Sequence, residues 1–179
     1  MPALPPFPDH LRGRLLKVAA GVLVWALAGC STGDPEPEQT LVGTRTQLCA
    51  ERVDAAGAGA VVGQPIAGLR ELNTFQPDVR VGECALTADG GGAMLSVQVV
   101  RDSKAAALSR ELETLSQTEN YSGDDHSGVT GEGRTTTALW AIDASYYVRV
   151  LGLGGTSAQQ RAAALALAED VAKRTEPLK

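Results

Sequence analysis

Apolar residues recur along this chain with two different periods, one typical of helices and one typical of strands. Where they lie three or four positions apart, the spacing predicts three helices, over residues 46–62, 103–118 and 157–173. Cys49 and Val53 begin the apolar face of the first helix. The second helix has a leucine stripe, and we expect Ser103 to be its N-cap.

Alternating apolar and polar residues predict the strands. They cover residues 81–87, 93–101, 135–142 and 145–151. Asp89-Gly90-Gly91-Gly92 is a turn sequence between the first two strands, and Asp143-Ala144 joins the last two. Strands in hairpin pairs with helices between them predict an α+β fold, in which an antiparallel sheet of about four to six strands is covered by three helices.

The first 30 residues carry a different pattern. Arg12, Arg14 and Lys17 precede a short apolar run over residues 18–27, which is too short to span a bilayer as a helix. The run ends in Leu27-Ala28-Gly29-Cys30, which resembles the lipobox of bacterial lipoproteins. That resemblance implies that residues 1–29 are a signal peptide removed before Cys30, and that the Cys30 sulfur carries a diacylglyceryl group.

The lipoprotein interpretation predicts a protein held at the extracytoplasmic face of the cell membrane by its lipid. Two alternatives remain. Ala26-Leu27-Ala28 also fits the small-residue site of ordinary secretory cleavage, and an uncleaved anchor is the third possibility. Residues 30–45 are poor in apolar side chains and contain Pro35 and Pro37, so we expect a flexible tether. Residues 46–176 then form a single domain.

Charge narrows the choice of partners. The whole chain has a formal net charge of −5, and removal of residues 1–29 changes it to about −7. No cluster of lysines and arginines stands out. Nucleic acid and anionic lipid head groups are therefore poor candidate partners, because both bind mainly through basic side chains.

The three cysteines favour a disulfide between Cys49 and Cys84. If Cys30 carries lipid, two cysteines remain, and each lies on the apolar face of its predicted element. The alternative is a pair of buried free thiols. A zinc site lacks ligands, since only one histidine follows Cys30.

Candidate chemistry is sparse. Asp124-Asp125-His126 could bind a divalent cation or act as acid and base, but adjacent polar residues in a Ser- and Gly-rich loop also make an ordinary turn. The glycines at 152–155 predict a turn that leads to a cap at Thr156 or Ser157. Trp140, Tyr146 and Tyr147 could line a groove, although strand aromatics more often pack in the core.

The layout as a whole resembles the small actinobacterial lipoproteins of unknown function, some of which are PsbP-like and some similar to the sensor domains of receptor kinases. Four features carry the resemblance: Cys49, Cys84, Gly131-Glu132-Gly133 before the second hairpin, and the Ala-rich segment 162–171. We expect a noncatalytic binding or interaction domain of the cell envelope, with no cofactor, no metal and no catalytic residues. Its partner would be an envelope protein, a cell-wall fragment or a small apolar ligand. A metal-assisted hydrolase using Asp124, Asp125 and His126 is the alternative, and a structural accessory subunit is a third.

Overall fold

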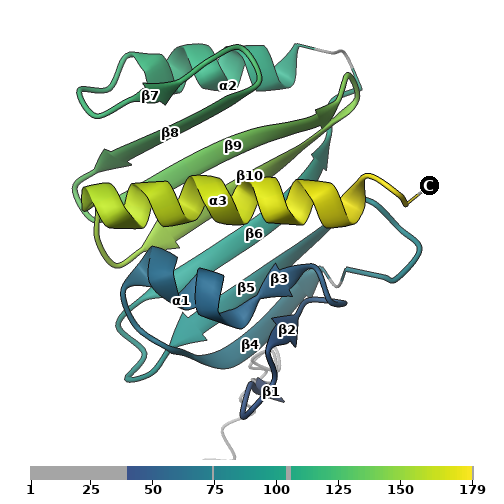
Figure 1. Ribbon diagram of the computed structural model, residues 1–179, viewed down its shortest axis with the longest axis vertical. Coiled ribbons are helices and arrows are strands. Elements are labelled where there is room, and N and C mark those ends of the chain that lie inside the picture. Colours follow the sequence, from purple (N-terminus) through teal and green to yellow (C-terminus); the bar gives the residue numbers. More distant parts are fainter. Residues whose placement is uncertain (1–39, 74, 104–105, 179) are drawn as a thin grey trace, which may run out of the picture. The chain divides into compact units, whose positions relative to one another are not determined.

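The computed structural model describes residues 40–73, 75–103 and 106–178, and in these ranges it contains three helices and ten strands (Figure 1). The helices are α1 (Ala55–Val62), α2 (Ala107–Ser116) and α3 (Ala158–Thr175). The strands are β1 (Thr40–Leu41), β2 (Gln47–Leu48), β3 (Val53–Asp54), β4 (Ile66–Asn73), β5 (Gly82–Ala88), β6 (Met94–Arg101), β7 (Ser122–Gly123), β8 (Ser127–Glu132), β9 (Thr135–Asp143) and β10 (Tyr146–Leu153). The predicted α+β class is confirmed.

Eight of the described strands form one antiparallel sheet in the order β1-β4-β5-β6-β10-β9-β8-β7, and β2 and β3 form a small separate sheet. Both predicted hairpins, β5–β6 and β9–β10, are present. The sheet is wider than expected because β1, β4, β7 and β8 were not predicted as strands. β8 reads as a loop in the sequence, since glycine, serine and threonine fill it around the single apolar residue Val129.

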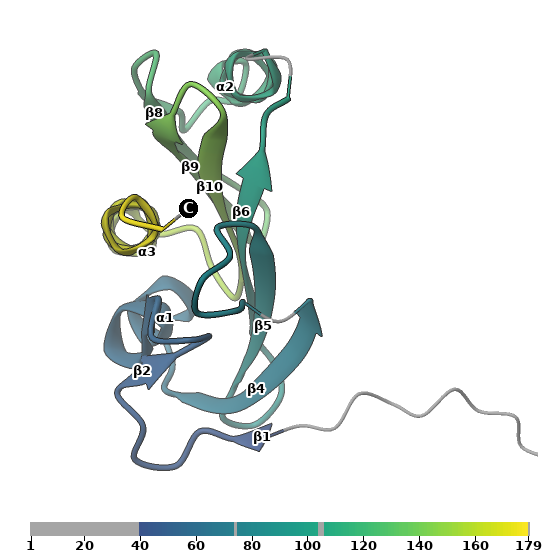
Figure 2. The ribbon, with the colours of Figure 1, turned by 90° about the vertical axis from the view of Figure 1, so that its right-hand side faces the viewer.

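α1 and α3 pack on one face of the sheet, and the main core lies between them and the strands (Figures 1 and 2). Alternate residues of the central strands point into this core. They include Cys84 and Leu86 of β5, Leu95, Val97 and Val99 of β6, and Val148 and Val150 of β10. The helices contribute Val61 and Val62 from α1, with Ala164, Leu167, Ala168 and Val171 from α3. α3 begins as predicted, because Ser157 caps it and forms a capping box with Gln160.

The first predicted helix is only half correct. The helix over 46–62 is replaced by the small β2–β3 sheet up to Asp54, whose side chain caps α1 by accepting a hydrogen bond of 2.7 Å from the Gly57 amide. Three consecutive residues, Cys49, Ala50 and Glu51, have positive φ angles of 56°, 54° and 65°. Such left-handed backbone costs a non-glycine residue roughly 1–2 kcal/mol, so tertiary contacts override the helical pattern here.

The disulfide between Cys49 and Cys84 is present, with 6.0 Å between the two Cα atoms. It joins the left-handed turn to β5, and both cysteines are buried in the main core. The apolar spacing of Cys49 therefore indicated its burial correctly, although Cys49 does not lie on a helix.

α2 packs on the opposite face of the sheet, against β8 and β9 (Figure 2). It begins four residues after the predicted cap, Ser103, and its cap residue Ala106 makes no side-chain hydrogen bond. Asp102 supplies the cap instead, because its Oδ2 atom accepts hydrogen bonds from the amides of Ala107 (2.6 Å) and Leu108 (3.2 Å).

The predicted signal peptide 1–29, Cys30 and the tether up to residue 39 lie outside the described residues. The last part of the predicted tether is folded: Thr40 and Leu41 pair with Leu69 and Gly68 of β4, and Val42 is buried. The ordered domain therefore begins before residue 46. Among the helices of the described ranges, none has the length and apolarity needed to cross a membrane.

Candidate functional site

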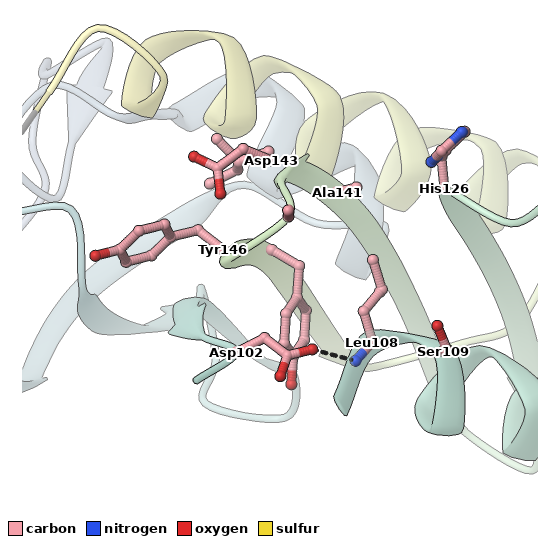
Figure 3. A pocket seen from close by; sticks show the side chains of 10 residues that line it. Asp102, Leu108, Ser109, His126, Ala141, Asp143 and Tyr146 are labelled. Carbon is pink, nitrogen blue, oxygen red and sulfur yellow. Dashed lines mark hydrogen bonds between the residues drawn. The ribbon is translucent and has the colours of Figure 1, made fainter. Parts of the chain in front are cut away.

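A pocket of about 530 Å³ lies at the end of the β9–β10 hairpin (Figure 3). Three segments far apart in the sequence supply its lining: the junction of β6 and α2, the residue before β8, and the hairpin itself. The lining residues are Asp102, Leu108, Ser109, His126, Ala141, Ile142, Asp143, Ala144, Tyr146 and Tyr147. Its volume falls in the range of pockets that take small molecules.

A β-bulge shapes the hairpin end. Tyr146 pairs with Asp143 but Tyr147 pairs with Ala141, so Ile142 is an extra residue on β9. Tyr146 packs against the main core from one face, whereas Tyr147 belongs to the second core cluster under α2. Two neighbouring tyrosines thus reach the same pocket from opposite faces of the sheet.

Arg80 holds the turn of the hairpin in place. Its Nη1 atom donates to Oδ2 of Asp143 at 2.6 Å, its Nη2 atom donates to the Glu176 carbonyl at 2.8 Å, and its Nε atom donates to the Leu178 carbonyl. The guanidinium also lies over the Tyr146 ring, 5.1 Å from its centre. Partial desolvation raises the pKa of the Asp143 carboxyl, but the Ser145 amide and Arg80 outweigh it, and the net pKa lies below its ordinary value.

Asp102 connects the pocket to α2. Besides capping the helix, it donates its own amide to the Ser145 carbonyl at 2.7 Å, which ties the end of β6 to the β9–β10 turn. Asp102 is only 7% exposed. Its carboxylate thus has a structural role that accounts for its burial.

The Asp124-Asp125-His126 cluster is a turn in the structure. Oδ1 of Asp124 accepts hydrogen bonds from the His126 amide (2.8 Å), the Ser127 amide (2.7 Å) and the Ser127 hydroxyl (3.1 Å). The two amide bonds are the main reason that the pKa of this carboxyl is lowered. No group of three or more potential metal ligands converges within the described ranges.

His126 lines the pocket, together with a serine and two aspartates that sequence reasoning did not connect to it. Figure 3 shows its ring directed away from Ser109, and no hydrogen bond joins these two side chains. The nucleophile–base contact required for a serine hydrolase is therefore not formed among these residues. Asp102, Ser109 and Asp143 could not be found from the sequence, because long-range packing brings them together.

Of the three aromatic residues singled out in the sequence, two line the pocket and one does not. Tyr147 is 1% exposed, and its hydroxyl donates to Oε1 of Glu111 on α2 at 2.6 Å. Burial and the Glu111 carboxylate raise the pKa of Tyr147 to about 12. Trp140 packs against the main core instead.

The glycine-rich segment before α3 forms the predicted turn. The Thr136 hydroxyl stabilises this turn by donating a hydrogen bond of 2.8 Å to the Gly155 carbonyl.

Glu111 is the centre of a group of hydrogen-bonded polar side chains on the face of the sheet that carries α2. Arg149 of β10 donates to both of its carboxylate oxygens: Nε donates to Oε2 at 3.0 Å, and Nη2 donates to Oε1. Desolvation alone would lower the pKa of Arg149, but the Glu111 carboxylate outweighs it, and the net pKa is raised. This ion pair joins α2 to the middle of the sheet.

Comparisons with protein-family models, with curated proteins and with solved structures found no match to this chain.

Proposed function

We propose that this protein is a lipid-anchored lipoprotein on the extracytoplasmic face of the cell membrane, with a noncatalytic binding domain that its lipid holds at the membrane surface. Cys30 carries the lipid, residues 1–29 are removed, and the segment up to β1 separates the domain from the bilayer. The whole proposal starts from Leu27-Ala28-Gly29-Cys30.

The observation that carries the proposal is the pairing of Cys49 with Cys84. The chain has three cysteines, so this bond leaves Cys30 as the one cysteine outside the disulfide. A disulfide that staples a small domain is typical of proteins outside the reducing cytoplasm. Lipid on Cys30 would give every cysteine a covalent partner.

A binding role is favoured over catalysis because the acidic side chains near the pocket already form structural hydrogen bonds and an ion pair. Asp124 forms a turn, Asp102 caps α2 and Asp143 pairs with Arg80. A catalytic carboxylate must be available to the reacting atoms, whereas these three hold the backbone or a neighbouring side chain. What remains is a folded surface with pockets, which suits recognition.

Metabolic labelling with radioactive palmitate tests the proposal in a bacterial host that processes lipoproteins. We expect label in the full-length protein and in the matched control Thr32→Ala, and no label in Cys30→Ala. Unlabelled wild-type protein, or label that persists in Cys30→Ala, would contradict the proposal.

A further inference from the structure

The left-handed turn at residues 49–51 has a backbone that its own residues disfavour. Cys49, Ala50 and Glu51 are the only non-glycine residues of the described ranges with positive φ angles, and they are consecutive. Such backbone persists only where the surrounding contacts impose it. Here the disulfide binds Cys49 to β5, and Nη1 of Arg174 on α3 donates to the Glu51 carbonyl at 3.1 Å. The conformation of the turn therefore depends in part on the oxidation state of two cysteines.

Arg52 follows the left-handed turn directly and binds the loop that precedes β5. Its guanidinium donates to the backbone carbonyls of Gln76, Val79 and Arg80. The disulfide reaches Cys84, which lies in β5 just beyond this loop. Residues 49–52 thus hold the segment 76–84 at two points, one covalent and one through hydrogen bonds.

The loop over residues 76–79 is exposed to solvent. One backbone hydrogen bond, from the Val79 amide to the Gln76 carbonyl at 3.2 Å, closes it. Segments with few buried contacts open at a low cost in free energy, so this loop takes its position from Arg52 rather than from its own packing.

Arg80 connects the loop to the hairpin pocket. Its Nη1 atom donates to Oδ2 of Asp143 at 2.6 Å, and its guanidinium lies over the Tyr146 ring. Asp143 and Tyr146 both line the pocket (Figure 3). A continuous series of contacts therefore runs from the disulfide through Arg52, the loop and Arg80 to the pocket. Such a series can carry a local change to a distant site when one of its elements has two arrangements.

We propose that this series of contacts is a redox-sensitive device that controls the hairpin pocket. When the Cys49–Cys84 bond is reduced, the left-handed turn relaxes to negative φ angles and Arg52 releases the loop. Arg80 then no longer holds the end of the β9–β10 hairpin, so the pocket loses its shape. The oxidised protein is the binding form. This inference rests on the proposed function, because only a binding domain uses the pocket.

The reductant is a protein dithiol of the cell envelope. One of its thiolates attacks a sulfur of the bond to form a mixed disulfide, which its second thiol then resolves. In total the bond between Cys49 and Cys84 breaks and both become thiols, while the reductant gives up two electrons and two protons and becomes a disulfide. Cys49 is 5% exposed, but Ala50 beside it is exposed, so opening of the turn gives the reductant access to the sulfur.

Hydrogen exchange on the full-length protein in detergent micelles tests the device, before and after reduction with dithiothreitol. The reporter is the amide of Asp102, which donates to the Ser145 carbonyl beside the pocket at 2.7 Å. The reference is the amide of Gly154, which donates to the Arg134 carbonyl at 3.0 Å at the other end of the hairpin. We expect reduction to accelerate exchange about tenfold at Asp102 and to leave it nearly unchanged at Gly154.

Arg80→Gln separates transmission to the pocket from a general loss of stability. It removes the link between the loop and the hairpin, so we expect fast exchange at Asp102 in both oxidation states, with no further acceleration on reduction. Arg134→Gln changes an exposed arginine outside the series of contacts and should respond to reduction as the wild type does. The double variant Cys49→Ala, Cys84→Ala should reproduce the reduced state without any reductant.

Three results would overturn the inference: a bond that dithiothreitol does not reduce in the folded protein, equal acceleration at Asp102 and Gly154, or an Arg80→Gln variant that responds to reduction as the wild type does. Palmitate labelling reports on the lipid anchor and not on this device. Labelled protein without the redox response overturns the device alone, whereas unlabelled protein overturns the proposed function.

Discussion

At the scale of single residues, Arg52 is the most consequential buried charge. It is 2% exposed, and its guanidinium donates to the backbone carbonyls of Gln76 (2.7 Å), Val79 (2.5 Å) and Arg80 (2.9 Å). It also lies over the Phe75 ring, and burial lowers its pKa. One side chain thereby fixes the loop before β5, and that loop in turn positions Arg80 at the hairpin pocket.

Substitution of Arg52 with methionine should destabilise the domain by about 3 kcal/mol. The methionine fills the apolar part of the site, but three backbone carbonyls lose their charged donor. Urea unfolding followed by circular dichroism measures the change, and Arg45→Met, at an exposed position, is the control. An unfolding midpoint equal to that of the control would refute the role given to Arg52.

The raised pKa of Tyr147 predicts that the stability of the domain decreases at alkaline pH. The ordinary pKa of a tyrosine is 10.0, and the pKa of Tyr147 in the folded protein is about 12, so the folded state retains this proton more strongly. The resulting stabilisation is complete below pH 10 and is lost as the pH rises toward 12. Absorbance titration of phenolate should therefore show a late ionisation step in the wild type that is missing in Tyr147→Phe. Identical late steps in the two proteins would contradict the raised pKa.

At the scale of elements, the start of α2 shows how a local pattern can mark the wrong residue. Ser103 has the right chemistry for a cap, but the helix begins at Ala107 and its first amides bind Asp102. Asp102→Ala should therefore cost about 1 kcal/mol, whereas Ser103→Ala should leave stability nearly unchanged. Thermal unfolding of the two variants decides between them. A larger loss for Ser103→Ala would restore the sequence-based cap.

The sequence predicted β5, β6, β9 and β10 because apolar residues recur at alternate positions in each of them. It failed at β8, where small residues are required by close neighbours. A Cβ atom at Gly128 would lie 2.8 Å from Leu112 of α2, and one at Gly131 would lie 2.7 Å from Thr156. Contacts of this kind depend on the packed fold, so periodicity alone does not indicate them.

The candidate site was even less accessible to sequence reasoning. The sequence drew attention to His126 because it follows Asp124 and Asp125. In the structure His126 lines the pocket, whereas the Asp124 carboxylate accepts hydrogen bonds that form a turn. The residues that share its pocket come from the β6–α2 junction and the β9–β10 hairpin. The hydrogen bonds that join Glu83, Gln98 and Arg149 likewise exist only through the strand register, because these residues lie on three different strands.

At the scale of the whole molecule, the disulfide joins the N-terminal turn to the centre of the sheet. It closes a sequence separation of 35 residues. Loss of the bond in a Cys49→Ala, Cys84→Ala double variant should lower the free energy of unfolding by about 3–4 kcal/mol. Chemical denaturation measures the difference, and oxidised wild-type protein is the reference. A double variant as stable as the wild type would show that the bond adds little.

The same bond links the fold to the account of where the protein works. If Cys49 and Cys84 pair outside the cytoplasm, Cys30 is the cysteine left to carry lipid, and the domain that follows acts as a tethered binding module. Mass spectrometry of the N-terminal peptide from the membrane fraction tests this central claim most directly. The account predicts a peptide that begins at Cys30 and carries a diacylglyceryl group. A peptide that begins at Gly29 without lipid, or one that retains residues 1–29, would contradict it.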